Sequence, residues 1–312
     1  MINKKMILIL PYFGSWPKYL DLYLKGCSNN KWLTVLFITN CKTPRNYPPN
    51  VKFIKKELHE ISSLISERLN IPNYELSSSY KLCDFKPTYG HLFNEHIKNY
   101  DYWGFGDIDL IYGSLDSFYF PKIDKDYDVI SAREEIVSGS LTFIKNNIYN
   151  NLLFKKLENF DLLIKSEAYE GIDETSHVED MWQGLNKLEL PKSSFTYLVA
   201  HENNLENIKA SFETIICENL LNHELIKFKD GNLCYQKKNI AYFHYVMNKR
   251  KPYFTYPSWK QIPNEFYITN TGFYKKFYVK ELYGPIKMMI TNMVYYLKRS
   301  PSYILRKIKG NK

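Results

Sequence analysis

Two carboxylates one residue apart, Asp107 and Asp109, are the side chains of this sequence best placed to do chemistry. They lie near the end of the segment 101–113, in which aromatic and branched residues alternate with small ones as in a buried strand. Desolvating two carboxylates is costly, so something must compensate their charge. Side chains at i and i+2 of an extended segment point to the same side, and oxygen ligands suit Mg²⁺ or Mn²⁺. The pair therefore predicts a metal site.

A histidine far along the chain could complete such a site. His244 lies in an apolar segment expected to be a strand over residues 239–245, and Asn248, Lys249, Arg250 and Lys251 follow it. Imidazole is a common metal ligand, and cationic side chains bind phosphate oxygens. The arrangement predicts a metal ligand next to a phosphate clamp.

Four further polar residues have both a functional and a structural interpretation. Asp84 and Lys86 precede Pro87, which suits the first turn of a helix expected to end near residue 99, so they either contact a ligand or cap that helix. Glu179 and Asp180 begin another expected helix, where the helix dipole alone favours acids. Their catalytic role depends on facing the edge that carries Asp107 and Asp109.

The elements that must position these residues follow a β-α-β order. Residues 5–10 and 32–39 are continuous apolar runs typical of buried strands, with a helix expected over 19–27 between them, followed by a third strand at 51–55 and a helix at 57–69. This order predicts an α/β fold, a Rossmann-like open mixed sheet flanked by helices. In such sheets ligands bind beyond the carboxyl ends of the strands, where residues 11–14 and 39–40 would lie.

Composition and length limit the classes of protein that fit. The chain has 312 residues, of which 45% are hydrophobic and 16% aromatic, which excludes a disordered protein. The apolar part of the N-terminus is too short for a signal peptide, and no long apolar run marks a membrane span. Five scattered cysteines without metal-ligand spacing fit reduced thiols. We expect a cytoplasmic protein.

Charge is distributed unevenly along the chain. Residues 249–312 hold 14 Lys and Arg against Glu265 and Glu281, a net +12, whereas the rest holds 28 bases and 31 acids, a net −3. The segment 286–308 could place Met289, Met293, Tyr296 and Leu297 on one helical face between basic ends, which either packs on its own domain or lies on a membrane. We expect a catalytic domain over 1–251 and a basic, mainly helical extension over 252–312 that contacts an anionic partner.

These residues together resemble the bacterial glycosyltransferases of the A-type fold, especially the small enzymes of capsule, lipopolysaccharide and exopolysaccharide synthesis. The resemblance covers about residues 5–250 and is carried by Lys81-Leu82-Cys83-Asp84-Phe85-Lys86-Pro87 and by the segment from Trp103 to Gly113. It implies transfer of a hexosyl group, such as galactosyl, from a nucleotide-diphosphate donor, with UDP the expected nucleotide. The implied acceptor is a saccharide or a lipid-linked saccharide at the cytoplasmic face of the inner membrane.

The resemblance also implies roles for individual residues. Asp107 and Asp109 would hold Mn²⁺ or Mg²⁺ and His244 would complete the shell; Glu179 or Asp180 would be the base of an inverting enzyme. Donor-binding positions would be Pro11, Tyr12, Gly14, Thr39, Asn40, Asp84, Lys86 and Lys249.

Two other classes of function remain open. A metal-dependent phosphohydrolase or nuclease would also use clustered acids and cations, although such enzymes commonly bridge two ions with several acids. A non-enzymatic protein that binds membranes or RNA would explain the basic extension, but we find no nucleic-acid-binding motif and expect no nucleic-acid partner.

Overall fold

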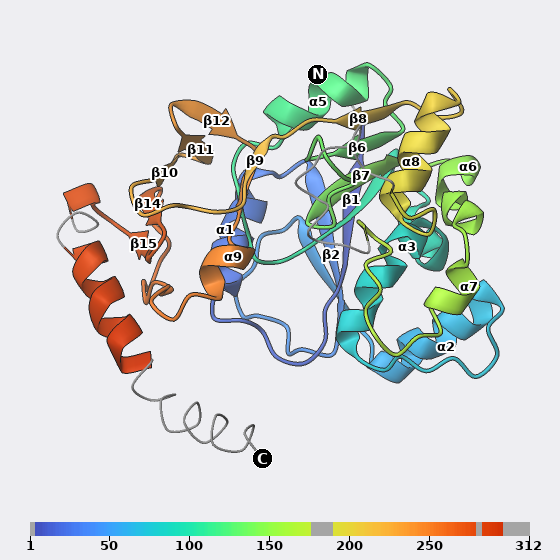
Figure 1. Ribbon diagram of the computed structural model, residues 1–312, viewed down its shortest axis with the longest axis horizontal. Helices are drawn as coiled ribbons and strands as arrows, with labels where there is room; N and C mark the ends of the chain where they lie inside the picture. Colours follow the sequence, from blue (N-terminus) through green and yellow to red (C-terminus); the bar gives the residue numbers. More distant parts are fainter. Residues whose placement is uncertain (1–3, 176–189, 279–282, 296–312) are drawn as a thin grey trace, which may run out of the picture. The chain divides into compact units, whose positions relative to one another are not determined.

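The computed structural model describes residues 4–175, 190–278 and 283–295 (Figure 1). The chain divides into two compact units, Met1–Leu110 with Ser114–Ile216, and Ile111–Gly113 with Cys217–Lys312. The division expected at residue 251, between a catalytic domain and an extension, concerns function and stays a prediction.

The first unit is built on a seven-stranded sheet with the order β3-β2-β1-β4-β7-β6-β8. Only β7 runs antiparallel to its neighbours, so the sheet is mixed, as predicted. Its strands are β1 (Met6–Pro11), β2 (Leu33–Thr39), β3 (Val51–Lys55), β4 (Tyr102–Gly106), β6 (Val129–Ser131), β7 (Leu141–Lys145) and β8 (Ala210–Phe212).

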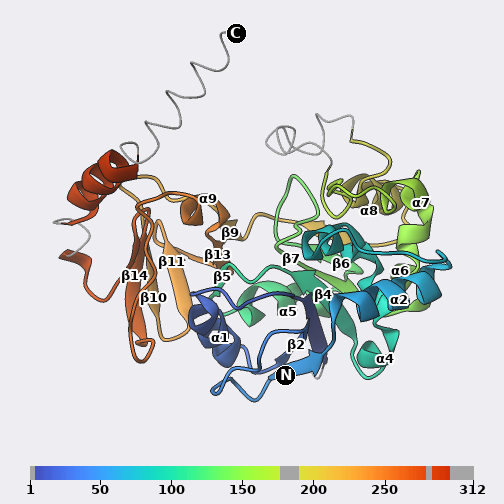
Figure 2. The same cartoon turned by 90° about the horizontal axis from the view of Figure 1, so that it is seen from below.

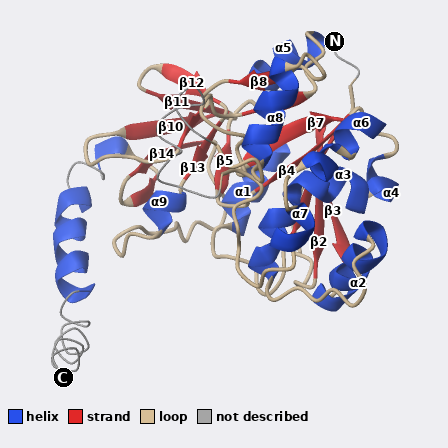
Figure 3. Cartoon of the chain, turned by 45° about the vertical axis from the view of Figure 1, so that its right-hand side comes forward, coloured by secondary structure: helices blue, strands red, loops and turns tan. Residues whose placement is uncertain are grey.

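Helices cover both faces of this sheet, shown in blue against red strands in Figure 3. On one face, Ile9, Ile38 and Phe105 belong to a large apolar cluster. The helices that contribute to this cluster are α2 (Leu58–Leu69), η1 (Ser79–Thr88), α3 (Tyr89–Leu92), α4 (Asn94–Ile97), η2 (Leu153–Lys156), α7 (Phe160–Leu163) and α8 (Phe195–Asn204). The short helix α6 (Ile148–Asn151) follows β7.

The opposite face of the sheet is covered by α1 (Leu20–Asn29) and α5 (Asp116–Asp124), which can be followed in Figure 2. Tyr23 of α1 packs edge-on against Phe37 of β2, and Tyr119 of α5 packs edge-on against Phe143 of β7. The fold is therefore the predicted α/β class, an open mixed sheet between two helical layers.

The second unit contains a five-stranded antiparallel sheet with the order β12-β11-β10-β14-β15. Its strands are β10 (Leu225–Lys229), β11 (Asn232–Tyr235), β12 (Lys238–Ile240), β14 (Glu265–Thr269) and β15 (Gly272–Tyr274). Residues from both sides of position 251 thus share one sheet. The extension predicted to be mainly helical supplies β14 and β15 as well as a helix over residues 283–295.

A smaller sheet with the order β5-β13-β9 joins β5 (Leu110–Tyr112), β13 (Tyr242–His244) and β9 (Ile216–Cys217), and α9 (Val246–Lys249) follows β13. The amide of Gly113, just after β5, donates to the carbonyl oxygen of Ala241 at 2.7 Å. Among the described residues, no helix is long and apolar enough to cross a membrane.

Candidate metal centre

The two acids lie on the short connection from β4 to β5, because the predicted continuous strand is interrupted there. β4 ends at Gly106 and β5 begins at Leu110. The amide of Asp107 donates to the carbonyl oxygen of Ser140 at 2.9 Å. A Cβ on Gly106 would lie only 2.7 Å from that same oxygen, so the close approach requires glycine. The chain thus turns at the carboxyl end of β4 and leaves both carboxylates beside the sheet edge.

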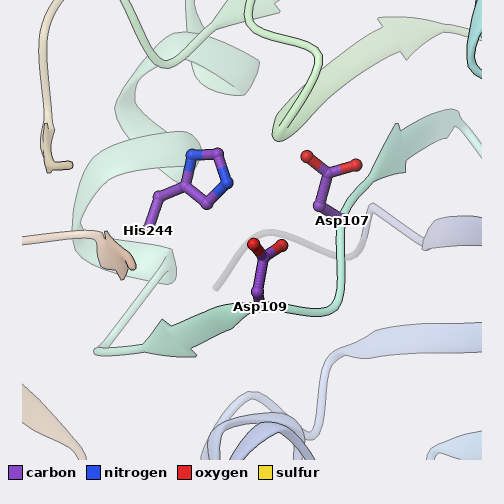
Figure 4. Close-up of side chains that lie close together, drawn as sticks. All are labelled: Asp107, Asp109 and His244. Atoms are coloured by element: carbon purple, nitrogen blue, oxygen red, sulfur yellow. The ribbon is translucent and has the colours of Figure 1, made fainter. Parts of the chain in front are cut away.

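Asp107, Asp109 and His244 offer ligand atoms that all lie within 4.8 Å of one another (Figure 4). Asp109 and His244 are buried, with 5% and 7% of their surface exposed, and Asp107 is partly exposed. Two carboxylates and an imidazole are a donor set that suits Mn²⁺ and related divalent ions. The three residues predicted to bind a metal are therefore brought together with chemistry that fits one.

His244 has a carboxylate partner of its own. Its Nδ1 lies 2.9 Å from Oε1 of Glu218, which is largely buried. A proton on Nδ1 satisfies this hydrogen bond and leaves Nε2 as the atom with a lone pair for a metal. Glu218 therefore fixes both the orientation and the tautomer that a ligand role requires.

Lys86 is buried next to the acids and contacts Asp107. Its Nζ lies 3.1 Å from Oδ1 of Asp107 and 3.1 Å from Oδ2 of Asp173, and donates to the carbonyl oxygen of Gly139 at 2.9 Å. Burial alone would lower the pKa of Lys86, but the charges of Asp107 and Asp173 raise it well above its usual value. Lys86 therefore stays charged and pairs with Asp107, whereas its contact with a donor stays a prediction.

Asp173 and Glu174 are neighbours of the site that the sequence did not indicate. Asp173 is 1% exposed and accepts a hydrogen bond from the hydroxyl of Tyr169 at 2.7 Å. Glu174 accepts one from the amide of Gly139 at 2.6 Å. Burial raises the pKa of Asp173, and burial together with the charge of Asp173 raises the pKa of Glu174 to about 7. With Asp107 and Asp109, four carboxyl groups thus lie close to the ammonium group of Lys86 in this part of the chain.

Asp84 has a different environment from the one its position suggested. Its carboxylate accepts hydrogen bonds from Lys81 and from the amides of Glu170 and Ile172, and is fully buried. No side chain caps α3. Pro87 lies inside the 3₁₀ helix η1. The capping interpretation of Asp84 is therefore wrong. Its carboxylate binds the backbone at residues 170 and 172, and its contact with a donor stays a prediction.

The predicted donor-binding residues at the ends of β1 and β2 lie along one edge of the sheet. Pro11 ends β1, and the amide of Tyr12 donates to the carbonyl oxygen of Ile38 at 2.9 Å. Because Ile9 of β1 pairs with Phe105 of β4, the chain beyond Pro11 runs beside the chain beyond Gly106. Burial and the charges of Cys41 and Asp109 raise the pKa of Tyr12.

The loop after β1 presents an aromatic surface at this edge. Tyr12 stacks on Trp16 with ring centroids 5.1 Å apart. Gly14 has φ +106°, and its amide donates to Oδ1 of Asn40 at 2.8 Å. Thr39 is buried at the end of β2 and accepts a hydrogen bond from the amide of Cys41. Thr39 and Asn40 thus shape the loop, and Tyr12 and Trp16 provide its aromatic side chains.

The remaining predicted residues are Lys249, Glu179 and Asp180. Lys249 is the last residue of α9 in the second unit, and its phosphate contact stays a prediction. Glu179 and Asp180 lie outside the described residues.

Comparisons with known proteins give a match to a family model and a set of similar solved structures, two of which are named below. A search of the curated proteins finds no match. The fold is similar to a galactosyltransferase, LgtC, in complex with donor and acceptor sugar analogues, with a TM-score of 0.33, 9% identity, and coverage of 68% of this chain and 75% of that chain. It is also similar to mouse xyloside xylosyltransferase 1 in its apo form, with a TM-score of 0.38, 8% identity, and coverage of 79% of this chain and 99% of that chain. Residues 8–277 match a family of unknown function, DUF6625, and the chain therefore belongs to the DUF6625 family.

Proposed function

We propose that this protein is a metal-dependent glycosyltransferase that moves a hexosyl group, such as galactosyl, from a UDP-linked donor to a saccharide or lipid-linked saccharide in bacterial surface polysaccharide synthesis. The observation that carries the proposal is the group of Asp107, Asp109 and His244, whose ligand atoms lie within 4.8 Å of one another. The acids of this group lie at the carboxyl edge of the sheet, where nucleotides bind in open α/β folds. Mn²⁺ or Mg²⁺ held there would offset the negative charge that develops on the departing diphosphate.

The protein's own residues would bind and orient the donor. The stacked rings of Tyr12 and Trp16 offer a flat apolar surface to a nucleotide base, beside the loop that Gly14 and Asn40 hold in place. Lys249 would contact the diphosphate through its ammonium group. Lys86, whose Nζ lies 3.1 Å from Oδ1 of Asp107, would keep that carboxylate in place for the metal.

The acceptor hydroxyl is a weak nucleophile and needs a proton acceptor if configuration is inverted. A carboxylate within hydrogen-bond reach would accelerate the attack by about 10²–10⁴-fold. Glu179 or Asp180 is the group we propose for this role.

Asp109→Asn tests the proposal directly, since it removes a charge and keeps the shape of the side chain. UDP-, GDP-, CMP- and dTDP-sugars are screened for stabilisation of the protein against heat, with and without Mn²⁺, because a ligand that binds only the folded state raises the melting temperature. We expect a Mn²⁺-dependent shift with a UDP-sugar for the wild type and none for Asp109→Asn. Asp161→Asn, at an exposed position, is the matched control and should behave as the wild type.

The same samples distinguish the competing enzyme classes. Release of UDP that depends on an acceptor saccharide supports the transferase. Cleavage of nucleic acid or of a simple phosphate ester, lost in Asp109→Asn, would show a nuclease or phosphohydrolase instead. Unchanged donor affinity in Asp109→Asn would contradict the metal-dependent scheme.

A second part of the proposal concerns the membrane surface. Six large apolar side chains on the helix over residues 283–295 are each at least 44% exposed; they are Tyr283, Ile286, Met289, Ile290, Met293 and Val294. Lys287 of the same helix donates to the carbonyl oxygen of Thr271 at 2.6 Å, so it attaches the helix to the turn between β14 and β15. An exposed apolar face in a segment with a net charge of +12 suits the surface of an anionic bilayer. We propose that this helix brings the enzyme to a lipid-linked acceptor.

A further inference from the structure

Lys81 and Asp84 form an ion pair that is completely withdrawn from solvent. Both belong to η1, both side chains are 0% exposed, and Nζ of Lys81 lies 2.8 Å from Oδ2 of Asp84. A buried pair is costly to desolvate, and replacing it with apolar residues is often neutral or stabilising. Stability alone therefore does not explain why two charged residues occupy these positions.

Four further side-chain hydrogen bonds of the pair go to one distant segment of the chain. Lys81 donates to the carbonyl oxygens of Leu163 and Ala168 at 3.0 and 2.7 Å. Asp84 accepts from the amides of Glu170 and Ile172 at 2.9 and 3.0 Å. An ammonium group and a carboxylate can satisfy two carbonyl and two amide groups of this segment together, whereas apolar side chains can satisfy none.

The segment fixed in this way leads directly to the metal centre. Ile172 is followed by Asp173, which pairs with Lys86, and Lys86 in turn holds Asp107. The fit around Asp173 is tight, because a Cβ on Gly139 would lie 2.7 Å from its Oδ2. A shift of residues 163–172 would therefore be transmitted to Asp173 and Lys86.

We propose that Lys81 and Asp84 are positioning residues for the metal centre. By fixing residues 163–172 they set Asp173 against Lys86, and so set the carboxylate of Asp107. The inference rests on the proposed function, because it assigns the pair to the same site. In this proposal the pair acts on Asp107 through the segment it holds.

The first measurement tests the contact between the pair and the segment, independently of metal. Asp84→Asn should speed hydrogen exchange at the amides of Glu170 and Ile172. The matched control is Asp128→Asn, because Asp128 also accepts from a backbone amide, that of Lys209 at 2.9 Å, and from the side chain of Asn150 at 3.0 Å. Asp128 precedes the first residue of β6, whereas Asp107 follows the last residue of β4. The Asp128→Asn variant should therefore leave the amides of Glu170 and Ile172 protected.

The second measurement tests the effect on the metal centre, with Mn²⁺ alone as the probe. We expect Asp84→Asn to weaken Mn²⁺ binding by about tenfold, the low end of what residues behind metal ligands contribute. Asp128→Asn should bind Mn²⁺ as the wild type does. Because Asp84→Asn leaves Lys81 buried without its partner, the double variant Lys81→Met with Asp84→Asn should melt at a higher temperature than Asp84→Asn. It should still bind Mn²⁺ weakly.

Each result decides between the possibilities. If the double variant binds Mn²⁺ as the wild type does, the pair serves stability only and the inference is overturned. Unchanged exchange at Glu170 and Ile172 in Asp84→Asn overturns it as well. If the wild type itself binds no Mn²⁺, the proposed function fails, and the role of the pair at a metal centre fails with it. Hydrogen exchange at Glu170 and Ile172 still shows in that case whether the pair holds the segment.

Discussion

At the scale of single residues, the orientation of His244 depends on Glu218. We expect Glu218→Ala to weaken Mn²⁺ binding by about 10–100-fold, because the imidazole loses the partner that fixes its ring and its tautomer. Glu218→Gln should recover part of the affinity, since the amide oxygen still accepts from Nδ1. Calorimetric titration with Mn²⁺ measures both effects. Equal affinity for Glu218→Ala and the wild type would show that His244 is not a ligand.

The sequence predicts a site residue when the neighbours that make it unusual lie next to it in the chain. Asp107 and Asp109 stood out because apolar residues next to them in the chain made their charge anomalous. Asp173 and Glu174 look like an ordinary acidic loop, and only Lys86 and Gly139, far away in the sequence, make them buried and interacting. Lys81 lies three residues before Asp84, but this spacing is common on exposed helices and does not by itself predict that the pair is buried.

At the scale of elements, β4, which leads into the site, packs closely against β7. A Cβ on Gly104 would lie 2.6 Å from the carbonyl oxygen of Thr142 and 2.6 Å from the ring of Phe143. We expect Gly104→Ala to lower the free energy of unfolding by about 1–3 kcal/mol, since two packed strands must separate to accept it.

Urea unfolding measures this loss, and Gly284→Ala is a suitable control. The nearest atom to a Cβ on Gly284 is 3.7 Å away, an ordinary contact, so this change should be tolerated. Equal stability of Gly104→Ala and the wild type would mean that β4 and β7 pair less closely than described.

The elements that the sequence predicted best are those with a complete local signal. The strands expected at 5–10, 32–39 and 51–55 match β1, β2 and β3 to within a residue, because continuous apolar runs bounded by polar loops are typical of buried parallel strands. The prediction that one strand continues through Asp107 was wrong, because β4 ends at Gly106 and the turn there depends on the contact with Ser140. The pairing of β10 with β14 joins residues on both sides of position 251, and no local pattern records such a partner.

At the scale of the whole molecule, stability should depend on pH through Lys287. Burial lowers the pKa of Lys287 from 10.5 to about 8. The folded chain therefore gives up this proton at lower pH than the unfolded chain. The contribution of Lys287 to stability should rise as pH increases from about 8 to about 10.5 and level off below about 8, where both states carry the proton. Urea unfolding of the wild type and Lys287→Met at several pH values isolates this contribution, since the other groups titrate in both. A constant difference between the two proteins would contradict the lowered pKa.

The uneven charge of the chain leads to a prediction about binding to membranes. The wild type should bind vesicles of phosphatidylcholine and phosphatidylglycerol at low salt, and binding should weaken as salt rises, because the screening length falls from about 10 Å at 0.1 M to about 3 Å at 1 M. Since the apolar face contributes independently, Ile290→Asn with Met293→Asn should reduce binding at every salt concentration.

A matched control separates this surface from exposed apolar residues in general. Ile148 and Leu162 are at least as exposed as Ile290 and Met293, but belong to the first unit, whose sequence does not carry the excess of basic residues. Ile148→Asn with Leu162→Asn should therefore leave vesicle binding unchanged in a sedimentation assay. Equal vesicle binding by the two double variants would exclude the helix over residues 283–295 as the membrane contact. Charge alone does not distinguish a phosphate backbone from a lipid surface, so binding to RNA with the same salt dependence would favour a nucleic-acid partner.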